Sequence, residues 1–137
     1  MQNENSETLV IASIPENINS VELYIDGILK MYNIDDELYG NVLISVIEGA
    51  NNAITHGNNC DVSKQVKIEH LLSENKKSIT FIITDEGSGF DYNNLADPTA
   101  PENIEDFGGR GVFLMKQLAD VTIFQKQGSI VELTFKL

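Results

Sequence analysis

The sequence predicts an α/β fold of the α+β type with two layers, in which helices stack on one face of a mostly antiparallel mixed sheet. Two long segments near the N-terminus repeat apolar residues at helical spacing, and four later segments are rich in strand-forming residues. The order is β-α-α-β-β-loop-α-β-β, in which strands that follow one another are expected to pair as hairpins. A chain of 137 residues is expected to form a single domain, spanning residues 1–137.

The sequence places five strands and three helices. The strands are expected at Thr8–Ile14, Val66–Leu72, Ile79–Thr84, Val121–Lys126 and Ile130–Leu137. The helices are expected at Ile18–Met31, from Asp35 or Asp36 to about His56, and at Gly111–Ala119. Gly57-Asn58-Asn59 ends the second helix. The chain from Asp85 to about Phe107 is polar and interrupted by two prolines, so a lid loop is expected at about residues 90–108.

The composition narrows the class of protein. The formal net charge is −12, and the nine basic residues form no cluster that could follow a phosphate backbone, so direct nucleic-acid binding is not expected. No apolar run approaches the ~18 residues that a membrane span needs. The polar N-terminus does not resemble a secretory signal, and the single cysteine, Cys60, cannot form an internal disulfide. These observations favour a cytoplasmic protein that does not associate with a membrane.

The second predicted helix has one apolar arc and one polar arc. The polar arc consists of Asn41, Ser45, Glu48, Asn51, Asn52, Thr55 and His56, with Ile44 as its apolar exception. A helix face that simply meets water normally carries Lys–Glu pairs, whereas this arc has no lysine or arginine, which favours a functional role over plain solvation. Glu48 and Asn52 are four residues apart, so their side chains are expected to project the same way. The Asn52 oxygen is suited to Mg²⁺, and the Glu48 carboxylate to accepting a proton from a hydroxyl.

Two glycine-containing segments follow. Asp85 closes a predicted strand, and its carboxylate can accept a hydrogen bond from an exocyclic amino group such as that of adenine. Gly87 and Gly89 come directly after it and allow the backbone to approach a flat ring. Gly108-Gly109-Arg110-Gly111 is expected to precede the third helix, where free N–H groups bind phosphate. A plain turn and a glycine hinge are the respective alternatives.

These three segments, in this order, resemble the sequence boxes of the GHKL ATPase superfamily. Within it, the chain is similar to the bacterial anti-sigma-factor serine kinases of the sporulation and general-stress type. The resemblance extends from about Leu9 to Leu137. It implies a Bergerat-type sandwich that binds ATP and Mg²⁺ under the lid.

The resemblance also implies roles for individual residues. Glu48 would be the catalytic base, and Asn52 would ligate Mg²⁺. The adenine box would be Asp85 with its two glycines, Gly87 and Gly89, and Ser129 would lie near adenine in the last hairpin. The phosphate-binding residues would be Gly109, Arg110 and Gly111.

The implied activity is transfer of the γ-phosphate of ATP to a serine of a STAS-type anti-anti-sigma partner, with alternative binding of a sigma factor. A homodimer is compatible with the sequence. The competing hypothesis is a non-catalytic, ATP-gated module that binds regulatory proteins, because the lid segment from Phe90 to Phe107 contains no lysine or arginine to meet the γ-phosphate. A histidine-kinase catalytic domain is a third reading, but it needs a helical segment with a phospho-accepting histidine, for which the chain is expected to have no room.

Overall fold

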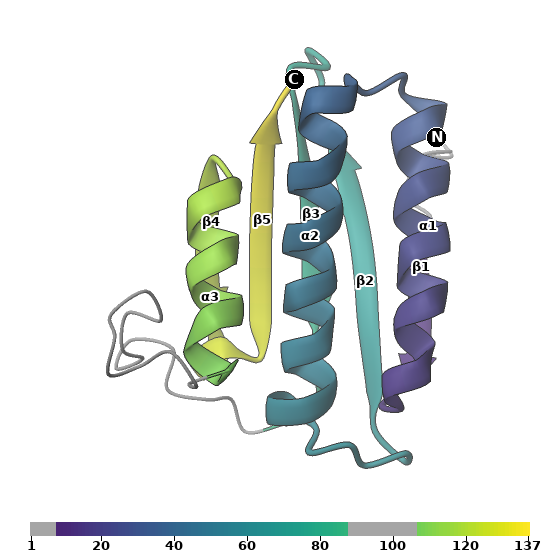
Figure 1. Ribbon diagram of the computed structural model, residues 1–137, viewed down its shortest axis with the longest axis vertical. Helices are drawn as coiled ribbons and strands as arrows, with labels where there is room; N and C mark the ends of the chain where they lie inside the picture. The colour runs from purple at the N-terminus through teal and green to yellow at the C-terminus, as the bar shows by residue number, and fades with distance from the viewer. Residues whose placement is uncertain (1–7, 88–106) are drawn as a thin grey trace.

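The computed structural model describes residues 8–87 and 107–137, with side chains from Val112 onward in the second range. Within these residues, three helices lie on one face of a five-stranded sheet, which confirms the predicted fold class (Figure 1). The strands are β1 (Thr8–Ala12), β2 (Gln65–Leu72), β3 (Ser78–Thr84), β4 (Val121–Gln125) and β5 (Ile130–Lys136). The helices are α1 (Ile18–Met31), α2 (Asp36–Asn52) and α3 (Phe107–Leu118), and one π-helical turn, Ala53–Gly57, continues α2.

Every strand pair in the described sheet is antiparallel, so the expected mixed character is not seen there. The strand order is β1-β2-β3-β5-β4. β2 pairs with β3 and β4 with β5, as predicted for strands that are neighbours in sequence. β5 also pairs with β3, and the register sets Thr84 opposite Ile130. This pairing brings the residues after β3 beside those before β5, and these are the segments that contain Asp85 and Ser129.

The core lies between the helices and the inner face of the sheet. Alternating residues of each strand point inward, and they pack against the apolar faces of α1 and α2. The largest fully buried apolar side chains are Phe81, Phe135, Ile25, Ile28, Leu29, Ile54, Ile68, Ile79, Ile83, Met115 and Leu133. Each such side chain contributes about 1.5–3 kcal/mol when it is fully buried. This core holds the long helix α2 over the centre of the sheet, where it runs along the direction of the strands (Figure 1).

The N-terminus of α2 is capped by Asp35. Its carboxylate Oδ1 accepts a hydrogen bond from the Glu37 backbone N–H at 3.2 Å, and Asp36 is the first residue of the helix. This contact resolves the two alternatives that the sequence left open. The first strand is shorter than predicted, because it ends at Ala12 and a 3₁₀ turn, Pro15–Asn17, leads into α1.

Three helical glycines differ in what surrounds them. A Cβ atom at Gly49 would lie 2.5 Å from Ile83 Cδ1 and 3.3 Å from Met115 Sδ. The absence of a side chain at Gly49 therefore allows α2 to approach both β3 and α3 closely. At Gly27 and Gly40, by contrast, no heavy atom lies within 4 Å of the position that a Cβ would take.

We expect Gly27→Ala and Gly40→Ala each to raise the free energy of unfolding, by up to about 1 kcal/mol. Alanine restricts the unfolded chain and favours helix, and at both positions the added methyl meets open space. Gly49→Ala is expected to lower the free energy of unfolding, because its methyl collides with the Ile83 side chain. Urea denaturation of the three variants checks this order, and a destabilised Gly27→Ala would contradict it.

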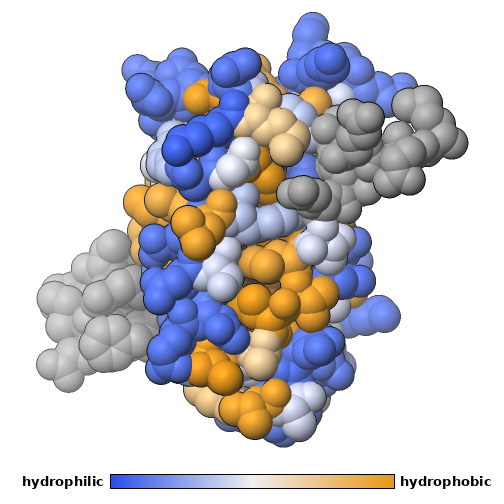
Figure 2. Space-filling model, turned by 90° about the vertical axis from the view of Figure 1, so that its right-hand side faces the viewer, coloured by the Kyte–Doolittle hydropathy of each residue, from blue (hydrophilic) through white to orange (hydrophobic). Residues whose placement is uncertain are grey.

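The outward surfaces of the molecule are mixed in polarity. On the outer face of the sheet, Glu69 pairs with Ile82, and the Thr80 and Thr134 hydroxyls are 2.8 Å apart. Figure 2 views the side of the molecule on which α1 lies, where exposed apolar side chains stand among polar ones. Leu23 of α1 is the most exposed of the large apolar side chains described. Among residues 8–87 and 107–137, no helix combines the length and apolar content needed to cross a membrane.

Candidate functional site

Glu48 and Asn52 lie near the C-terminal end of α2. The sequence assigned both to the polar arc, but the fold covers Asn52, which is only 6% exposed, and Glu48 is partly buried. Ser45, from the same arc, is also buried and donates its hydroxyl to the Asn41 carbonyl at 2.7 Å. The polar arc is therefore not a plain solvated face, because part of it is enclosed by the fold.

The Asn52 carboxamide has unused hydrogen-bonding capacity. Its Nδ2 atom is buried and has no hydrogen-bond partner among the described residues. A buried polar atom without a partner costs about 1–3 kcal/mol, so such a group is expected to meet a ligand or another segment. Half a turn about the last side-chain bond exchanges oxygen and nitrogen, so this end of the group can offer either atom. With its oxygen on this side, Asn52 could therefore serve as a metal ligand.

The described residues contain no cluster of three or more His, Cys, Asp or Glu side chains that could hold a metal ion.

The carboxyl group of Glu48 is electrostatically unusual for a helix surface. Partial burial raises the pKa of Glu48 above the ordinary glutamate value, because desolvation disfavours the charged form. A raised pKa makes the carboxylate a better proton acceptor than an exposed glutamate.

Asp85 directly follows β3, which ends at Thr84, and is 8% exposed. Its Oδ1 atom accepts a hydrogen bond from the Gly87 backbone N–H at 2.8 Å. Burial raises the pKa of Asp85, while the Gly87 N–H and the charge of Lys64 act in the opposite direction. Glu86, next in sequence, is exposed, and its side chain accepts a hydrogen bond from the Gln65 N–H. Asp85 is therefore the buried carboxylate of the pair.

The end of the α2 extension contacts the turn after β3 directly. A Cβ atom at Gly57 would lie 2.3 Å from Asp85 Oδ2, and one at Gly87 would lie 1.8 Å from the Gly57 carbonyl oxygen. Only glycine at both positions allows this approach. The contact joins the first motif, which carries Glu48 and Asn52, to the second, which carries Asp85.

Ser129 is buried beside the same turn. Its backbone carbonyl accepts a hydrogen bond from the Asp85 N–H at 2.9 Å, and its hydroxyl donates to the Lys126 carbonyl at 3.0 Å. The tight connection before it has Gln127 at φ 60° and Gly128 at φ 95°. The resemblance implied that Ser129 would lie near adenine, and the structure places Ser129 beside Asp85, the residue expected to read adenine.

The segment that the sequence predicted to bind phosphate differs from the prediction in one respect. The sequence expected Gly108-Gly109-Arg110-Gly111 to precede a helix that starts at Gly111, but α3 already begins at Phe107. In an α-helix only the first few N–H groups lack an internal acceptor. The free donors are therefore expected at the start of this segment, around Gly108 and Gly109, rather than at Gly111. Gly89 and residues 90–106 of the expected lid lie outside the described residues. For the rest of the lid and for Arg110, the structure describes the backbone but not the side chains.

The sequence did not single out Asn58, Ser13 or Lys64. Asn58 and Ser13 are both fully buried, and Lys64 influences the Asp85 carboxylate. The only sequence signal was that Asn58 follows the glycine that ends the helix, which is typical of a helix stop. Only the fold brings these residues together. Ser13 follows β1, Asn58 follows the π-helical turn Ala53–Gly57, and Lys64 precedes β2.

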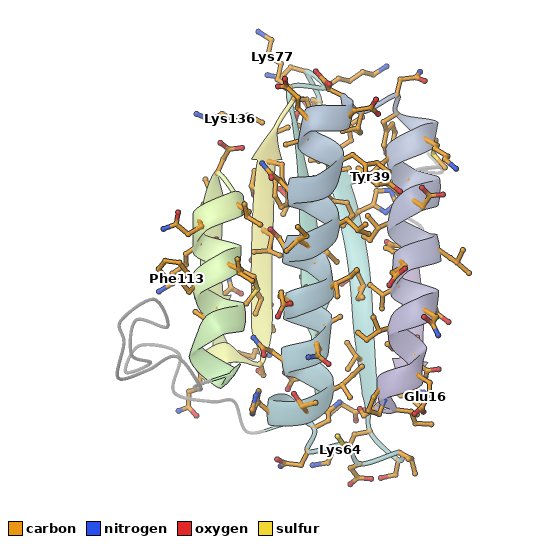
Figure 3. All side chains as sticks on the ribbon, in the orientation of Figure 1. Glu16, Tyr39, Lys64, Lys77, Phe113 and Lys136 are labelled. Carbon is orange, nitrogen blue, oxygen red and sulfur yellow. The ribbon has the colours of Figure 1, made fainter. Side chains whose placement is uncertain are left out.

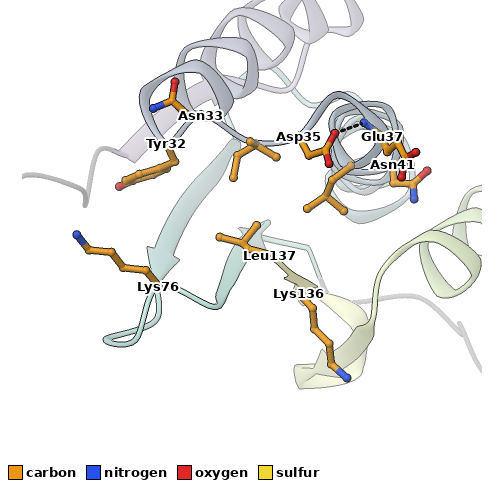
Figure 4. Close-up of a pocket in the computed structure, with 10 residues that line it drawn as sticks. Tyr32, Asn33, Asp35, Glu37, Asn41, Lys76, Lys136 and Leu137 are labelled. Atoms are coloured by element: carbon orange, nitrogen blue, oxygen red, sulfur yellow. Dashed lines mark hydrogen bonds between the residues drawn. The ribbon is translucent and has the colours of Figure 1, made fainter.

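A cavity of about 490 Å³ lies at the other end of the molecule (Figure 4). Its walls include Tyr32, Leu38, Lys76 and Leu137. Because Lys136 pairs with Ser78 at the start of β3, this end is separated from Asp85 by the length of that strand, roughly 20 Å. Figure 3 labels Lys136 and Lys64 at the two opposite ends. The cavity therefore does not belong to the predicted nucleotide site.

Comparisons with known proteins agree with the arrangement of the motifs. The model of the histidine kinase-like ATPase domain matches residues 11–135, a range that contains all three motifs. The serine-protein kinase RsbW of Oceanobacillus iheyensis is 25% identical over 126 residues, which cover 88% of this chain and 78% of that protein. The serine-protein kinase RsbW of Bacillus licheniformis is 32% identical over 114 residues, which cover 77% of this chain and 69% of that protein.

Proposed function

Because this chain belongs to the histidine kinase-like ATPase domain family, we propose that it is an ATP-dependent protein-serine kinase that acts as an anti-sigma regulatory factor. Its acceptor would be a serine of a STAS-type anti-anti-sigma partner, and it would bind a sigma factor in the alternative state. The family resemblance predicted from the three motifs is confirmed. The two RsbW relatives support the kinase class, since both are named serine-protein kinases.

The observation that supports this proposal most strongly is the contact between Gly57 and Asp85. A nucleotide site of the proposed kind needs a base-reading group and a metal-holding group on one rim, although they are far apart in sequence. The contact joins the π-helical turn Ala53–Gly57, which directly follows Asn52, to Asp85, which directly follows β3. The Asn52 carboxamide, whose buried Nδ2 atom has no hydrogen-bond partner among the described residues, would then be available to a ligand near this contact.

We assign the binding roles as follows. The carboxylate of Asp85 accepts a hydrogen bond from the adenine amino group, and Gly87 allows the ring to approach the backbone. Asn52 would hold Mg²⁺, which neutralises phosphate charge when bound. The N–H groups in the first turn of α3 would hold phosphate oxygens, since they lack acceptors within the helix and form the positive end of its dipole.

We assign Glu48 as the group that takes the proton from the incoming serine hydroxyl. Two observations support this role. Its partial burial raises the pKa of Glu48, which makes the carboxylate more basic, and its position one turn before Asn52 places it beside the proposed metal ligand. Most of the rate enhancement would come from positioning and from neutralisation of phosphate charge, because phosphoryl transfer makes small demands on a base.

The second candidate is a non-catalytic module in which bound ATP decides which regulatory protein can dock. The observation that favours it is the absence of lysine and arginine between Phe90 and Phe107. Incubation of the protein with radiolabelled ATP and the STAS-domain proteins of the host separates the two candidates. Label in a STAS protein supports the kinase, and tight, ATP-dependent binding without label transfer supports the module.

The cytoplasmic location and the homodimer both stay predictions.

We expect Asn52→Ala to abolish the Mg²⁺ dependence of ATP binding, and Asp85→Asn to reduce the preference for ATP over GTP. The first variant removes the metal ligand, and the second replaces part of an acceptor by a donor where adenine presents a donor. Calorimetry with both nucleotides, with and without Mg²⁺, measures these effects.

Two neighbouring residues serve as matched controls. Asn51→Ala removes an exposed carboxamide next to Asn52, and Glu86→Gln neutralises the exposed carboxylate next to Asp85. Both controls are expected to bind ATP as the wild type does. Unchanged affinity and base preference in Asn52→Ala and Asp85→Asn would contradict the assigned site.

A further inference from the structure

The Asn58 side chain connects several segments of the fold. It is completely buried, and its Nδ2 atom donates to Ser13 Oγ at 2.8 Å and to the Gln65 carbonyl at 3.0 Å. Its Oδ1 atom accepts a hydrogen bond from the Glu86 N–H at 2.8 Å. Both donors and one acceptor position of the carboxamide are therefore in use. The side chain ties together the segment after β1, the start of β2 and the turn after β3.

The orientation of Asn58 is itself fixed from two sides. Its backbone N–H donates to the Ala53 carbonyl at 2.8 Å, which closes the π-helical turn at the end of α2. Ser13, the acceptor of one of its N–H groups, donates its own hydroxyl to the Lys64 carbonyl at 2.8 Å. Ser13 is also completely buried, so its hydrogen bond with Asn58 is shielded from water and strengthened by the low local dielectric.

The hydrogen bond from the Glu86 N–H links this network to the proposed adenine site, because Glu86 lies between Asp85 and Gly87. Asp85 precedes it, and Gly87 follows it and donates its N–H to the Asp85 carboxylate. With the backbone held at Glu86, that carboxylate keeps one oxygen on Gly87 and the other against Gly57. Without the Asn58 acceptor, the Glu86 N–H would be free to turn toward water, and the carboxylate would lose its fixed direction.

We propose that Asn58 is a positioning residue for base selection, whose carboxamide holds the turn Asp85–Gly87 in the geometry that distinguishes adenine from guanine. This inference rests on the proposed function, because only an adenine-nucleotide site gives Asp85 a base to read. Asn58 acts through Asp85 and does not itself contact the nucleotide. Preorganisation of this kind lowers the free energy that must be spent to order a binding group.

The test is the ratio of ATP to GTP affinity, measured by calorimetry in the presence of Mg²⁺. Asn58→Ala is expected to weaken ATP binding roughly tenfold and to change GTP binding much less, so that the preference for ATP falls. Ser13→Ala removes one support of the carboxamide but leaves the bond to Glu86, so it should change the ratio in the same direction by a smaller factor. It also keeps the test valid if Asn58→Ala does not fold.

Tyr24→Phe is the matched control. Tyr24 shares a hydrogen bond of 3.0 Å with His70 under α1, so the variant loses a partly buried hydrogen bond in a different part of the fold. It is expected to lower stability while leaving the ATP to GTP ratio unchanged. A merely structural role for Asn58 would likewise leave the ratio unchanged.

The results for the wild type and the variants separate two failures. If the wild type shows no preference for ATP over GTP, the proposed adenine site is wrong, and this inference falls with it. If the wild type prefers ATP but Asn58→Ala and Ser13→Ala weaken both nucleotides by the same factor, Asn58 supports the fold only, and the inference alone is overturned.

Discussion

Replacement of Glu48 by glutamine is expected to lower the rate of serine phosphorylation at least roughly tenfold while leaving ATP affinity unchanged. Glutamine keeps the shape and size of the side chain but cannot take the proton of the attacking hydroxyl. The upper end of the range for a general base, about 10⁴-fold, is not expected, because a loose phosphoryl-transfer transition state depends little on proton removal. Single-turnover phosphorylation of a STAS-type partner and calorimetry with ATP give the two quantities.

The pH dependence of the rate provides a second reading of the same residue. Glu48 accepts a proton only when it is ionised, so the wild-type rate should fall as the pH falls through its pKa. Because burial raises the pKa of Glu48, this fall should begin at a higher pH than for an exposed glutamate. Glu48→Gln should lack this dependence on pH.

The control for Glu48 is Glu37→Gln, which neutralises an exposed carboxylate in the first turn of the same helix. It should phosphorylate at the wild-type rate. Phosphorylation by Glu48→Gln at the wild-type rate would show that Glu48 has a structural role. A wild type that labels no STAS-type partner would favour the ATP-gated binding module.

Gly87→Ala is expected to lower the free energy of unfolding by about 3 kcal/mol and to abolish measurable ATP binding. A Cβ atom at this position would lie 1.8 Å from the Gly57 carbonyl oxygen, and no side-chain rotation can relieve a collision with backbone. The turn after β3 would have to move away from the end of α2, and Asp85 would move with it. Urea denaturation and calorimetry with Mg²⁺ and ATP measure the two effects.

Two other glycine variants show which part of this loss arises from the local contact. Gly57→Ala places its methyl against the Asp85 carboxylate, a side chain that can rotate, so it should reduce ATP binding with a smaller loss of stability. Gly27→Ala adds the same methyl to open space on α1 and should bind ATP normally. If Gly87→Ala binds ATP as tightly as the wild type, the contact between the two motifs is not required for the site.

The sequence predicted the elements well where a local rule decides them. The start and end of α1 follow from apolar residues repeated at helical spacing, and they agree with the structure residue for residue. The strands of the two hairpins were placed to within one residue, because runs of strand-forming residues bounded by polar turns mark them in the sequence. The third helix was predicted to begin at Gly111 but begins at Phe107, since glycines have low helix propensity and tertiary packing overrides it.

For the candidate site, the sequence by itself determined which residue types are available and on which elements they lie. Glu48 and Asn52 fall one turn apart on a helix, and Asp85 falls at a strand end, because local periodicity assigns those positions. Only the tertiary structure decided that Asn52 is buried with an Nδ2 atom that has no partner in the described part of the chain, and that Gly57 lies against the Asp85 carboxylate. The tertiary structure also places Asn58 and Ser13, which are 45 residues apart in the sequence, within hydrogen-bonding distance of each other. Burial and long-range hydrogen bonds depend on how α2 packs on the sheet. No local pattern encodes the distance between residues that the chain brings together only when it folds.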